Sequence, residues 1–404
     1  MRTLLVSLMI LLSLPAICQI VPTSAITTID RKEKYLDSIV KMIGDKRIVA
    51  IGEDTHGTGD FYDLRAAITQ RLLREKGFNM VILENPHEDM LAMQEKLSTE
   101  NLDTLMRQHL FEIYQSKEMR NFLFWFRKQA IKQKNLRLAG CDDSYRDILP
   151  RYIQRAAAPY NNKGLNNLCV QLLEQTKEGT PQTPAQFVIN SHVLRQMDSI
   201  CIAGNYNDAR LKEYIYHAQS GYEYEMRTLK KIVTSRDEIM GERINFHAAD
   251  PSAKIIVWAH SAHIARYAWL MKEVGMMGAT IVKRNPNDYY SIGLSGGTGT
   301  YSYINTRFIN VDHTFKDSLL HANLYPIEAN SWNQTFNDAQ PAAYLIDFAK
   351  LSAADRAEWA KPRPIKMLGY NKATKTGNYY PVTLPNMFDA LIFLKETRHT
   401  TALF

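Results

Sequence analysis

The sequence lacks several of the patterns by which common protein classes are recognised. Its 404 residues include only 4 cysteines, none of them in C-x-x-C spacing, so neither a disulfide framework nor a cysteine zinc site is indicated. It contains no apolar run of the roughly 18 residues that a membrane-spanning helix needs. The net charge is +7, but lysine and arginine are spread among the acidic residues, so nucleic-acid binding is not indicated. The remaining composition is that of an ordinary globular protein.

The N-terminal segment has the features of a secretory signal peptide. One arginine precedes a short apolar run that ends at Pro15, and small residues follow. We expect residues 1–19 to be removed, which leaves a mature domain of residues 20–404 in the periplasm or outside the cell. A lipid anchor at Cys18 is the less favoured alternative, because the residues before it make a poor lipobox. We expect no stable membrane insertion after signal removal.

Three cysteines remain after this cleavage, and three cannot form a disulfide framework. Cys201 falls on the apolar stripe of an expected helix, which favours buried free thiols. A single disulfide bond between Cys169 and Cys201 remains an alternative, because export leads to an oxidising compartment.

Four short apolar runs, each ending in a polar or acidic residue, predict the fold. They are "RIVAIGE" (47–53), "NMVILEN" (79–85), "LRLAGCD" (136–142) and "KIIVWAH" (254–260). The segment between the first two has helical spacing of apolar residues. Strand, helix and strand with near-continuous apolar strands predict an α/β fold with a largely parallel central sheet covered by helices.

Two further regions complete the expected architecture. Residues 143–247 have helical periods and predict a helical insertion that walls off a substrate cleft. After it, a helix is expected from His263, and "TIVKR" (280–284), residues 289–304 and residues 387–396 resemble strands, some of them antiparallel. The glycines of "GLSGGTG" (293–299) suggest a hairpin. This stretch also matches the G-x-S-x-G nucleophile motif, but no helix follows, so we interpret the match as accidental.

The polar residues at the strand ends are the candidates for chemistry. In "GEDTHG" (52–57), Glu53 and His56 lie three residues apart, bracketed by glycines, and Glu84 ends the second strand. "VWAHSAHIARY" adds His260 and His263 at the end of the fourth. In parallel sheets, ligands bind beyond the carboxyl ends of the strands, so we expect these side chains to converge. From the residues alone, a catalytic pocket and a zinc site are equally supported, although no H-E-x-x-H motif appears.

Several of these motifs together resemble the erythromycin esterase family. They are "GEDTHGTGDFYDLR", "VILEN", "SRDEIM", "VWAHSAHIAR" and "MFDALIF", in that order across residues 47–395. The second histidine motif departs from the family pattern, because it has Ser261 where an asparagine is usual. The resemblance implies a hydrolase that opens an ester or macrolide lactone by attack of water, with no serine or cysteine nucleophile.

The resemblance also implies roles for individual residues. His56 matches the general base, with Glu53, Glu84 and His260 as further catalytic residues and with Arg65 and His263 as substrate-binding residues. No metal ligand and no cofactor are expected, and the partner is a small ester or lactone. Two alternatives stay open: a metal-dependent hydrolase of another envelope substrate that uses the same pocket, and a non-catalytic binding protein of the envelope.

The signal-peptide interpretation makes a direct prediction. The exported chain should begin near Gln19 or Ile20, because the short apolar run is followed by small residues that signal peptidases accept. N-terminal sequencing of the secreted or periplasmic protein checks this. Protein that keeps Met1 and sediments with membranes would contradict it.

Overall fold

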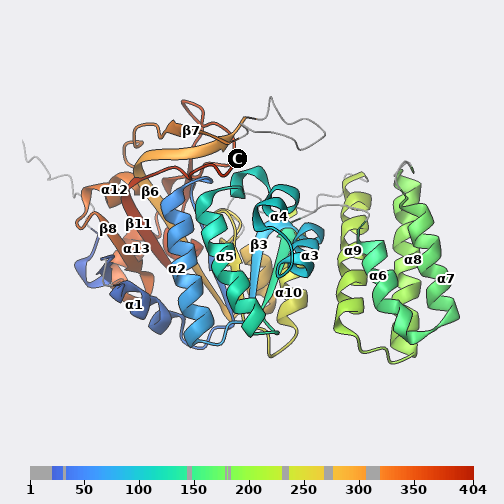
Figure 1. Cartoon of the computed structure of the whole chain (residues 1–404). Coiled ribbons are helices and arrows are strands. Elements are labelled where there is room, and N and C mark those ends of the chain that lie inside the picture. The colour runs from blue at the N-terminus through green and yellow to red at the C-terminus, as the bar shows by residue number, and fades with distance from the viewer. Residues whose placement is uncertain are drawn as a thin grey trace, which may run out of the picture.

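The structure is a computed structural model that describes residues 21–30, 33–142, 148–177, 180, 183–229, 236–267, 276–305 and 319–404 (Figure 1). The signal peptide expected at residues 1–19 lies outside these ranges. Among the described residues, no helix combines the length and the apolar character needed to cross a membrane.

A mostly parallel sheet forms the centre of the molecule. Its strands, from edge to edge, are β1 (Ile26–Thr28), β8 (Ala343–Asp347), β11 (Ala390–Thr397), β6 (Tyr289–Ile304), β2 (Ile48–Ile51), β5 (Ile255–Trp258), β3 (Met80–Pro86) and β4 (Arg137–Asp142). From β11 to β4 every neighbouring pair is parallel, whereas β1 and β8 pair antiparallel at one edge. The fold class expected from the sequence is confirmed.

Two further antiparallel pairings involve residues late in the chain. Strand β7 (Leu319–Asn323) pairs with the end of β6, and β9 (Arg363–Lys366) pairs with β10 (Tyr379–Val382) in a separate two-stranded sheet.

Both faces of the central sheet are buried, which explains why its strands are nearly continuous apolar runs. In β2, Val49 and Ile51 contribute to one hydrophobic core, and Ile48 and Ala50 contribute to the other. Successive side chains of a strand point to opposite faces, so a strand covered on both sides must be apolar at every position.

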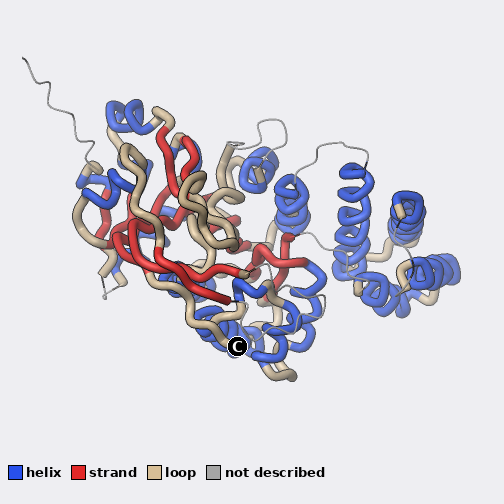
Figure 2. Tube along the Cα trace, turned by 90° about the horizontal axis from the view of Figure 1, so that it is seen from above, coloured by secondary structure: helices blue, strands red, loops and turns tan. Residues whose placement is uncertain are grey.

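Helices cover the two faces, as the view along the sheet shows (Figure 2). One core is formed with helices α1 (Lys34–Ile43), α2 (Gly59–Glu75), α3 (His87–Lys96), α4 (Leu102–His109) and α5 (Lys117–Lys132). The other is formed with helices α10 (Arg236–Ala248), α11 (Met277–Arg284), α12 (Trp332–Asp338), α13 (Ala353–Trp359) and α14 (Leu384–Met387).

Four helices between β4 and β5 form a bundle with a core of its own. They are α6 (Leu149–Ala157), α7 (Lys163–Gln175), α8 (Pro184–Ala203) and α9 (Ala209–Leu229), and they stand beside α3 and α10 in Figure 1. Thr183 caps α8 through its side chain and Gly204 follows its end. Helix α10 packs on the sheet instead, so the region predicted as one insertion has two structural parts.

Three local expectations after residue 260 are wrong or untested. Residues of "TIVKR" belong to helix α11, because a single apolar face at helical spacing packs on the sheet. His263 lies in a turn rather than at a helix start, and residues 268–275 lie outside the described part of the chain. The expected hairpin at residues 296–299 is absent, because β6 runs straight through it.

Gly299 shows why glycines occur within this strand. Its φ is +113°, and a Cβ there would lie 1.9 Å from the carbonyl oxygen of Thr397 on β11. Glycine therefore permits a close approach of two strands rather than a reversal of the chain.

Ser295 of the G-x-S-x-G match lies inside β6 and is buried. Its hydroxyl donates to Asp54 Oδ2 at 2.6 Å and accepts a hydrogen bond from Asn333 Nδ2 at 3.0 Å. Lys366 Nζ lies 3.7 Å from the same Asp54 oxygen. Burial raises the pKa of Asp54, and Lys366 and Ser295 oppose this shift. The serine is a structural hydrogen-bond donor, which confirms that the motif match is accidental.

Removal of this hydroxyl should lower stability. We expect Ser295→Ala to reduce the free energy of unfolding by about 1–3 kcal/mol, because it leaves a buried carboxylate and a buried amide each short of a partner. Urea denaturation measures the change. Thr298→Ala on the same strand is the control, because Thr298 is exposed and should change stability by less than about 0.5 kcal/mol. Equal stability of Ser295→Ala and wild type would contradict this account.

Candidate active site

A pocket of about 580 Å³ lies beyond the carboxyl ends of β2, β3, β4 and β5. Its walls carry acidic and basic side chains together with apolar ones. The residues that line it are His56, Glu84, Phe111, Glu112, Ile113, Tyr114, Asp142, Arg236, His260, His263, Ile304, Gly369 and Tyr370. The sheet thus brings together the polar strand ends that the sequence singled out, in the position where parallel sheets bind ligands.

Glu53 and His56 form a buried pair in the loop between β2 and α2. His56 Nδ1 lies 2.8 Å from Glu53 Oε1. A carboxylate only accepts hydrogen bonds, so Nδ1 carries the proton and Nε2 keeps its lone pair. Among the described residues, Nε2 makes no hydrogen bond, and the ring lines the pocket.

Arg65 holds Glu53 from the other side. Its Nη1 lies 3.0 Å from Glu53 Oε1, both side chains are fully buried, and its Nη2 donates to the carbonyl of Ala259. The guanidinium contacts Glu53 and is not among the residues that line the pocket, so the substrate-binding role expected for Arg65 stays a prediction. It compensates the charge of the carboxylate that orients His56.

The loop that carries this pair is fixed by backbone hydrogen bonds on both sides. The N–H of His56 donates to the carbonyl of Leu368, and the carbonyl of Gly57 accepts from Ser302 at 2.9 Å and from Thr400 at 3.0 Å. Gly57 has φ +71°, and a Cβ there would lie 2.3 Å from the Ser302 carbonyl oxygen. Glycine is required here by both conformation and space.

A second buried cluster is centred on Glu84. Its Oε1 lies 3.2 Å from His263 Nε2, and its Oε2 accepts the backbone N–H of His260 at 2.7 Å. His263 Nδ1 lies 2.9 Å from both carboxylate oxygens of Asp237. Burial alone would lower the pKa of His263, but Glu84 and Asp237 raise it to about 10. His263 is therefore a cation held between two carboxylates.

The pKa of Glu84 is correspondingly low. Burial raises it, but His263, His56 and Arg236 together hold the pKa well below its ordinary value. The carboxylate stays ionised at neutral pH.

Arg236 and Asp237 are site residues that sequence reasoning missed. Arg236 Nε donates to Asp142 Oδ1 at 2.6 Å, and its Nη2 lies 3.2 Å from Glu84 Oε1. Both residues stand at the first turn of α10, far in sequence from the strand ends. The sequence feature that could have identified these two residues is a pair of opposite charges at the start of a helix, within the motif "SRDEIM".

His260 lies between the two clusters. Its Nε2 donates to the carbonyls of Leu368 at 3.1 Å and Asp54 at 3.3 Å, and its Nδ1 accepts the N–H of Ala262. Burial, then the neighbouring His56 and His263, lower the pKa of this ring well below its ordinary value. A neutral imidazole with both nitrogens engaged stands 4.9 Å from the ring of His56, centroid to centroid.

The pocket wall combines charged and apolar side chains. His56, the cation His263 and Arg236 line it. Phe111, Ile113 and other apolar or aromatic side chains form the rest of the wall. Such a pocket suits a ligand with a polar reacting group and an apolar body.

Of the region predicted as an insertion, residues 143–247, Arg236 at the start of α10 lines this pocket, whereas the four-helix bundle contributes no described residue to it. Residues 111–114, 304 and 369–370 line the pocket instead. The bundle stands beside the edge of the sheet that ends in β4, whereas these loops lie across the strand ends. The three described cysteines are buried free thiols, as the sequence favoured.

His263 predicts a specific dependence of stability on pH. Its pKa in the folded protein is about 10, above the roughly 6.5 of an unfolded imidazole. Its stabilisation is therefore complete below about pH 6.5 and is lost as the pH rises toward about 10. The difference in unfolding free energy between wild type and His263→Gln should shrink across this range in urea titrations. A difference that stays constant or grows with pH would contradict the assignment of a cation.

Known proteins resemble this chain throughout its length. Erythromycin esterase type II of Escherichia coli is 20% identical over 316 residues, which cover 66% of this chain and 74% of that protein. A Bacillus cereus protein of solved structure superposes with a TM-score of 0.81 at 20% identity, covering 94% of this chain and 97% of that one. The solved structure of a mutant of the erythromycin esterase EreC, in its open conformation, superposes with a TM-score of 0.68 at 15% identity. The superposition covers 93% of this chain and 96% of that one.

At these identities the structural likeness establishes the fold alone. The sequence match is more specific, because the model of the family described as erythromycin esterase matches residues 73–397. The chain belongs to the erythromycin esterase family.

Proposed function

We propose that this protein is an exported hydrolase that cleaves an ester or lactone by attack of a water molecule that His56 activates. The observation that carries the proposal is the hydrogen bond of 2.8 Å from His56 Nδ1 to the buried Glu53. It leaves Nε2 unprotonated at the surface of the pocket. Family membership supports a hydrolase, and the arrangement of this pair supports the mechanism.

His56 accepts the proton of the attacking water at Nε2. As the water oxygen bonds to the carbonyl carbon, the imidazole becomes a cation, and Glu53 stabilises it through the Nδ1–H bond. Arg65 fixes Glu53 in place and compensates its charge, since a buried carboxylate without a partner would be strongly disfavoured. General-base assistance of this kind typically contributes a rate factor of about 10²–10⁴.

The developing negative charge on the carbonyl oxygen needs a donor within the pocket. Arg236 lines the pocket and can hydrogen-bond an oxyanion. The positive charge of His263 supports the oxyanion through space, because both of its N–H groups already contact carboxylates. A preorganised donor of this kind is typically worth about 3–4 kcal/mol of the barrier. When the tetrahedral intermediate collapses, the proton on His56 Nε2 passes to the leaving alkoxide. His260 positions the His56 ring by packing against it.

Direct attack by water is favoured over a covalent route by the composition of the walls. Among the described residues that line the pocket there is no serine, threonine or cysteine. The oxygens of Glu84 are occupied by His263, Arg236 and the N–H of His260. The nitrogens of His260 and His263 are likewise engaged, which disfavours a metal bound by these two rings.

The size and chemistry of the pocket suggest the substrate class. A volume of about 580 Å³ falls in the range of pockets that take drug-sized molecules. Its aromatic and aliphatic wall suits the apolar body of a lactone such as a macrolide, with the reacting carbonyl at the charged end. The signal peptide expected at residues 1–19 supports action on molecules in the periplasm or outside the cell.

The proposal predicts a large effect of His56→Asn on turnover. Asparagine tolerates the loop geometry but cannot serve as the base, so kcat should fall by about 10²–10⁴ while ligand binding stays nearly intact. Assays use a panel of chromogenic esters and lactones, macrolides included.

His321→Asn is the matched control, because it makes the same substitution at an exposed histidine of β7. It should leave kcat unchanged. Near-normal turnover by folded His56→Asn, on a substrate that the wild type hydrolyses, would show that His56 is structural.

A further inference from the structure

A second group of buried histidines lies outside the pocket, where the helical bundle meets the sheet. His87 begins α3, Glu213 and His217 stand on α9, and His247 is near the end of α10. The four side chains are at most 5% exposed. One ligand atom from each of them lies within 4.8 Å of all the others. Three structural elements, far apart in sequence, thus direct metal-binding atoms at one point.

Four imidazole nitrogens of the cluster have no hydrogen-bond partner in the described part of the protein. His87 Nε2, both ring nitrogens of His217 and His247 Nε2 are buried and make no hydrogen bond. A buried polar atom without a partner is rare and calls for an explanation. The pocket histidines differ, because His260 and His263 have both ring nitrogens engaged.

We propose that His87, Glu213, His217 and His247 bind a divalent transition-metal ion, Zn²⁺ by their donor set, which joins the helical bundle to the sheet domain. This proposal does not depend on the hydrolase mechanism. Three imidazoles and one carboxylate are typical zinc ligands, and four protein ligands close a tetrahedral structural site.

The distances fit an empty site of this kind. Zinc bonds of about 2.0–2.1 Å at tetrahedral angles place ligand atoms about 3.4 Å apart. Glu213 Oε1 lies 3.6 Å from His87 Nε2 and 4.0 Å from His247 Nε2. Small side-chain rotations would bring these atoms to bonding distance. The rings of His87 and His217 are stacked with centroids 3.4 Å apart and planes 9° apart. Ring rotation would be needed here, because the in-plane lone pairs of two parallel rings do not converge on one ion.

A hydrogen bond on the second nitrogen already orients one of the ligands. His87 Nδ1 donates to the carbonyl of Gly140 at 3.0 Å, which leaves the lone pair on Nε2 directed at the cluster. Such a bond on the second nitrogen is usual for metal-ligating histidines.

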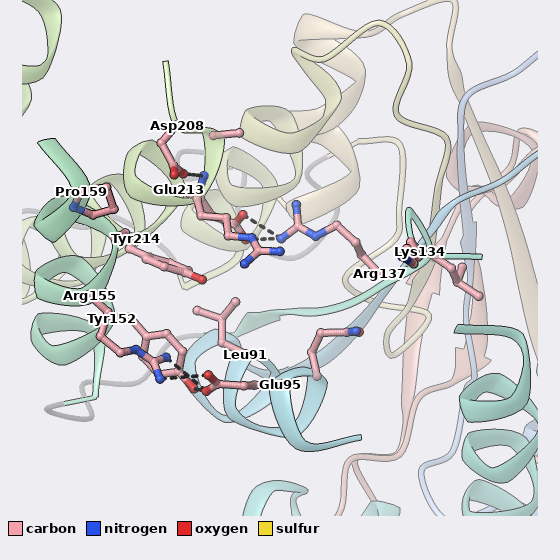
Figure 3. A pocket seen from close by; sticks show the side chains of 15 residues that line it. Leu91, Glu95, Lys134, Arg137, Tyr152, Arg155, Pro159, Asp208, Glu213 and Tyr214 are labelled. Carbon is pink, nitrogen blue, oxygen red and sulfur yellow. Dashed lines mark hydrogen bonds and ion pairs between the residues drawn. The ribbon is translucent and has the colours of Figure 1, made fainter. Parts of the chain in front are cut away.

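Two arginines lie near the cluster and act on it in different ways. Arg137 Nη2 contacts both oxygens of Glu213, at 2.6 and 2.7 Å, and Figure 3 shows this pair between β4 and α9. Glu213 can bind an ion through one oxygen while Arg137 keeps the other. Arg243 donates to the carbonyls of Cys141 and Asp142 and adds positive charge, which weakens the binding of a cation. The affinity should therefore be moderate for a site with four ligands.

A groove beside the cluster offers a route for the ion. A pocket of about 720 Å³ between β4, α3 and the bundle is lined by Arg137 and Glu213, among other residues (Figure 3). The Arg137 side chain is 37% exposed. Movement of this one arginine would open the carboxylate of Glu213 to solvent.

The test uses the full chain, purified without metal-chelating resin and treated with EDTA. Addition of ZnCl₂ should load one ion per chain by elemental analysis and raise Tm. CoCl₂ should give the visible absorption of tetrahedral cobalt. His217→Gln should weaken zinc binding by more than the roughly 10–100-fold that follows from loss of a residue that only hydrogen-bonds a metal ligand. Addition of ZnCl₂ should not raise the Tm of this variant.

Control variants locate the ion. His192→Gln changes an exposed histidine of the same bundle, and His56→Asn changes the catalytic pocket; both should bind zinc as the wild type does. Wild type without zinc uptake or cobalt absorption would overturn the proposal, even if His217→Gln failed to fold. Unchanged affinity in folded His217→Gln would also overturn it, and loss of zinc in His56→Asn alone would place the ion in the other pocket.

Discussion

The active site depends on one electrostatic constraint, the burial of the Glu53 carboxylate at the end of β2. A buried charge is tolerated only when it is paired and hydrogen-bonded, and Glu53 meets both Arg65 and His56 through the same oxygen. Arg65 comes from α2 and His56 from the loop before it. The turn from β2 into α2 therefore determines the position of Glu53, the tautomer of His56 and the direction of its free nitrogen.

Two structural elements, the end of β3 and helix α10, connect this pocket to the histidine cluster where the helical bundle meets the sheet. The end of β3 carries Glu84 into the pocket, and three residues later His87 faces the cluster. Helix α10 has Arg236 at the pocket and His247 at the cluster. A metal ion bound there would hold α3 and α10 together and would anchor a bundle that has its own hydrophobic core.

The sequence predicted those parts of the site that follow from strand periodicity. Strands buried on both faces are apolar runs, so Glu53, Glu84 and Asp142 stood out where the runs end. Arg236 and Asp237 were missed, because their partners depend on where α10 packs. "TIVKR" was misassigned, because a short apolar run fits a strand or a buried helix equally well. Glu213 and His217 have the one-turn spacing of a ligand pair, but only the tertiary fold brings His87 and His247 to them.

The central claim is that water, and no side chain, attacks the substrate carbonyl. Rapid quenching of a single turnover, followed by mass measurement of the intact chain, tests it most directly. The account predicts an unmodified protein mass at every time point while the ester disappears, because His56 only moves a proton. A transient increase equal to the mass of the acyl group, on any residue, would contradict it.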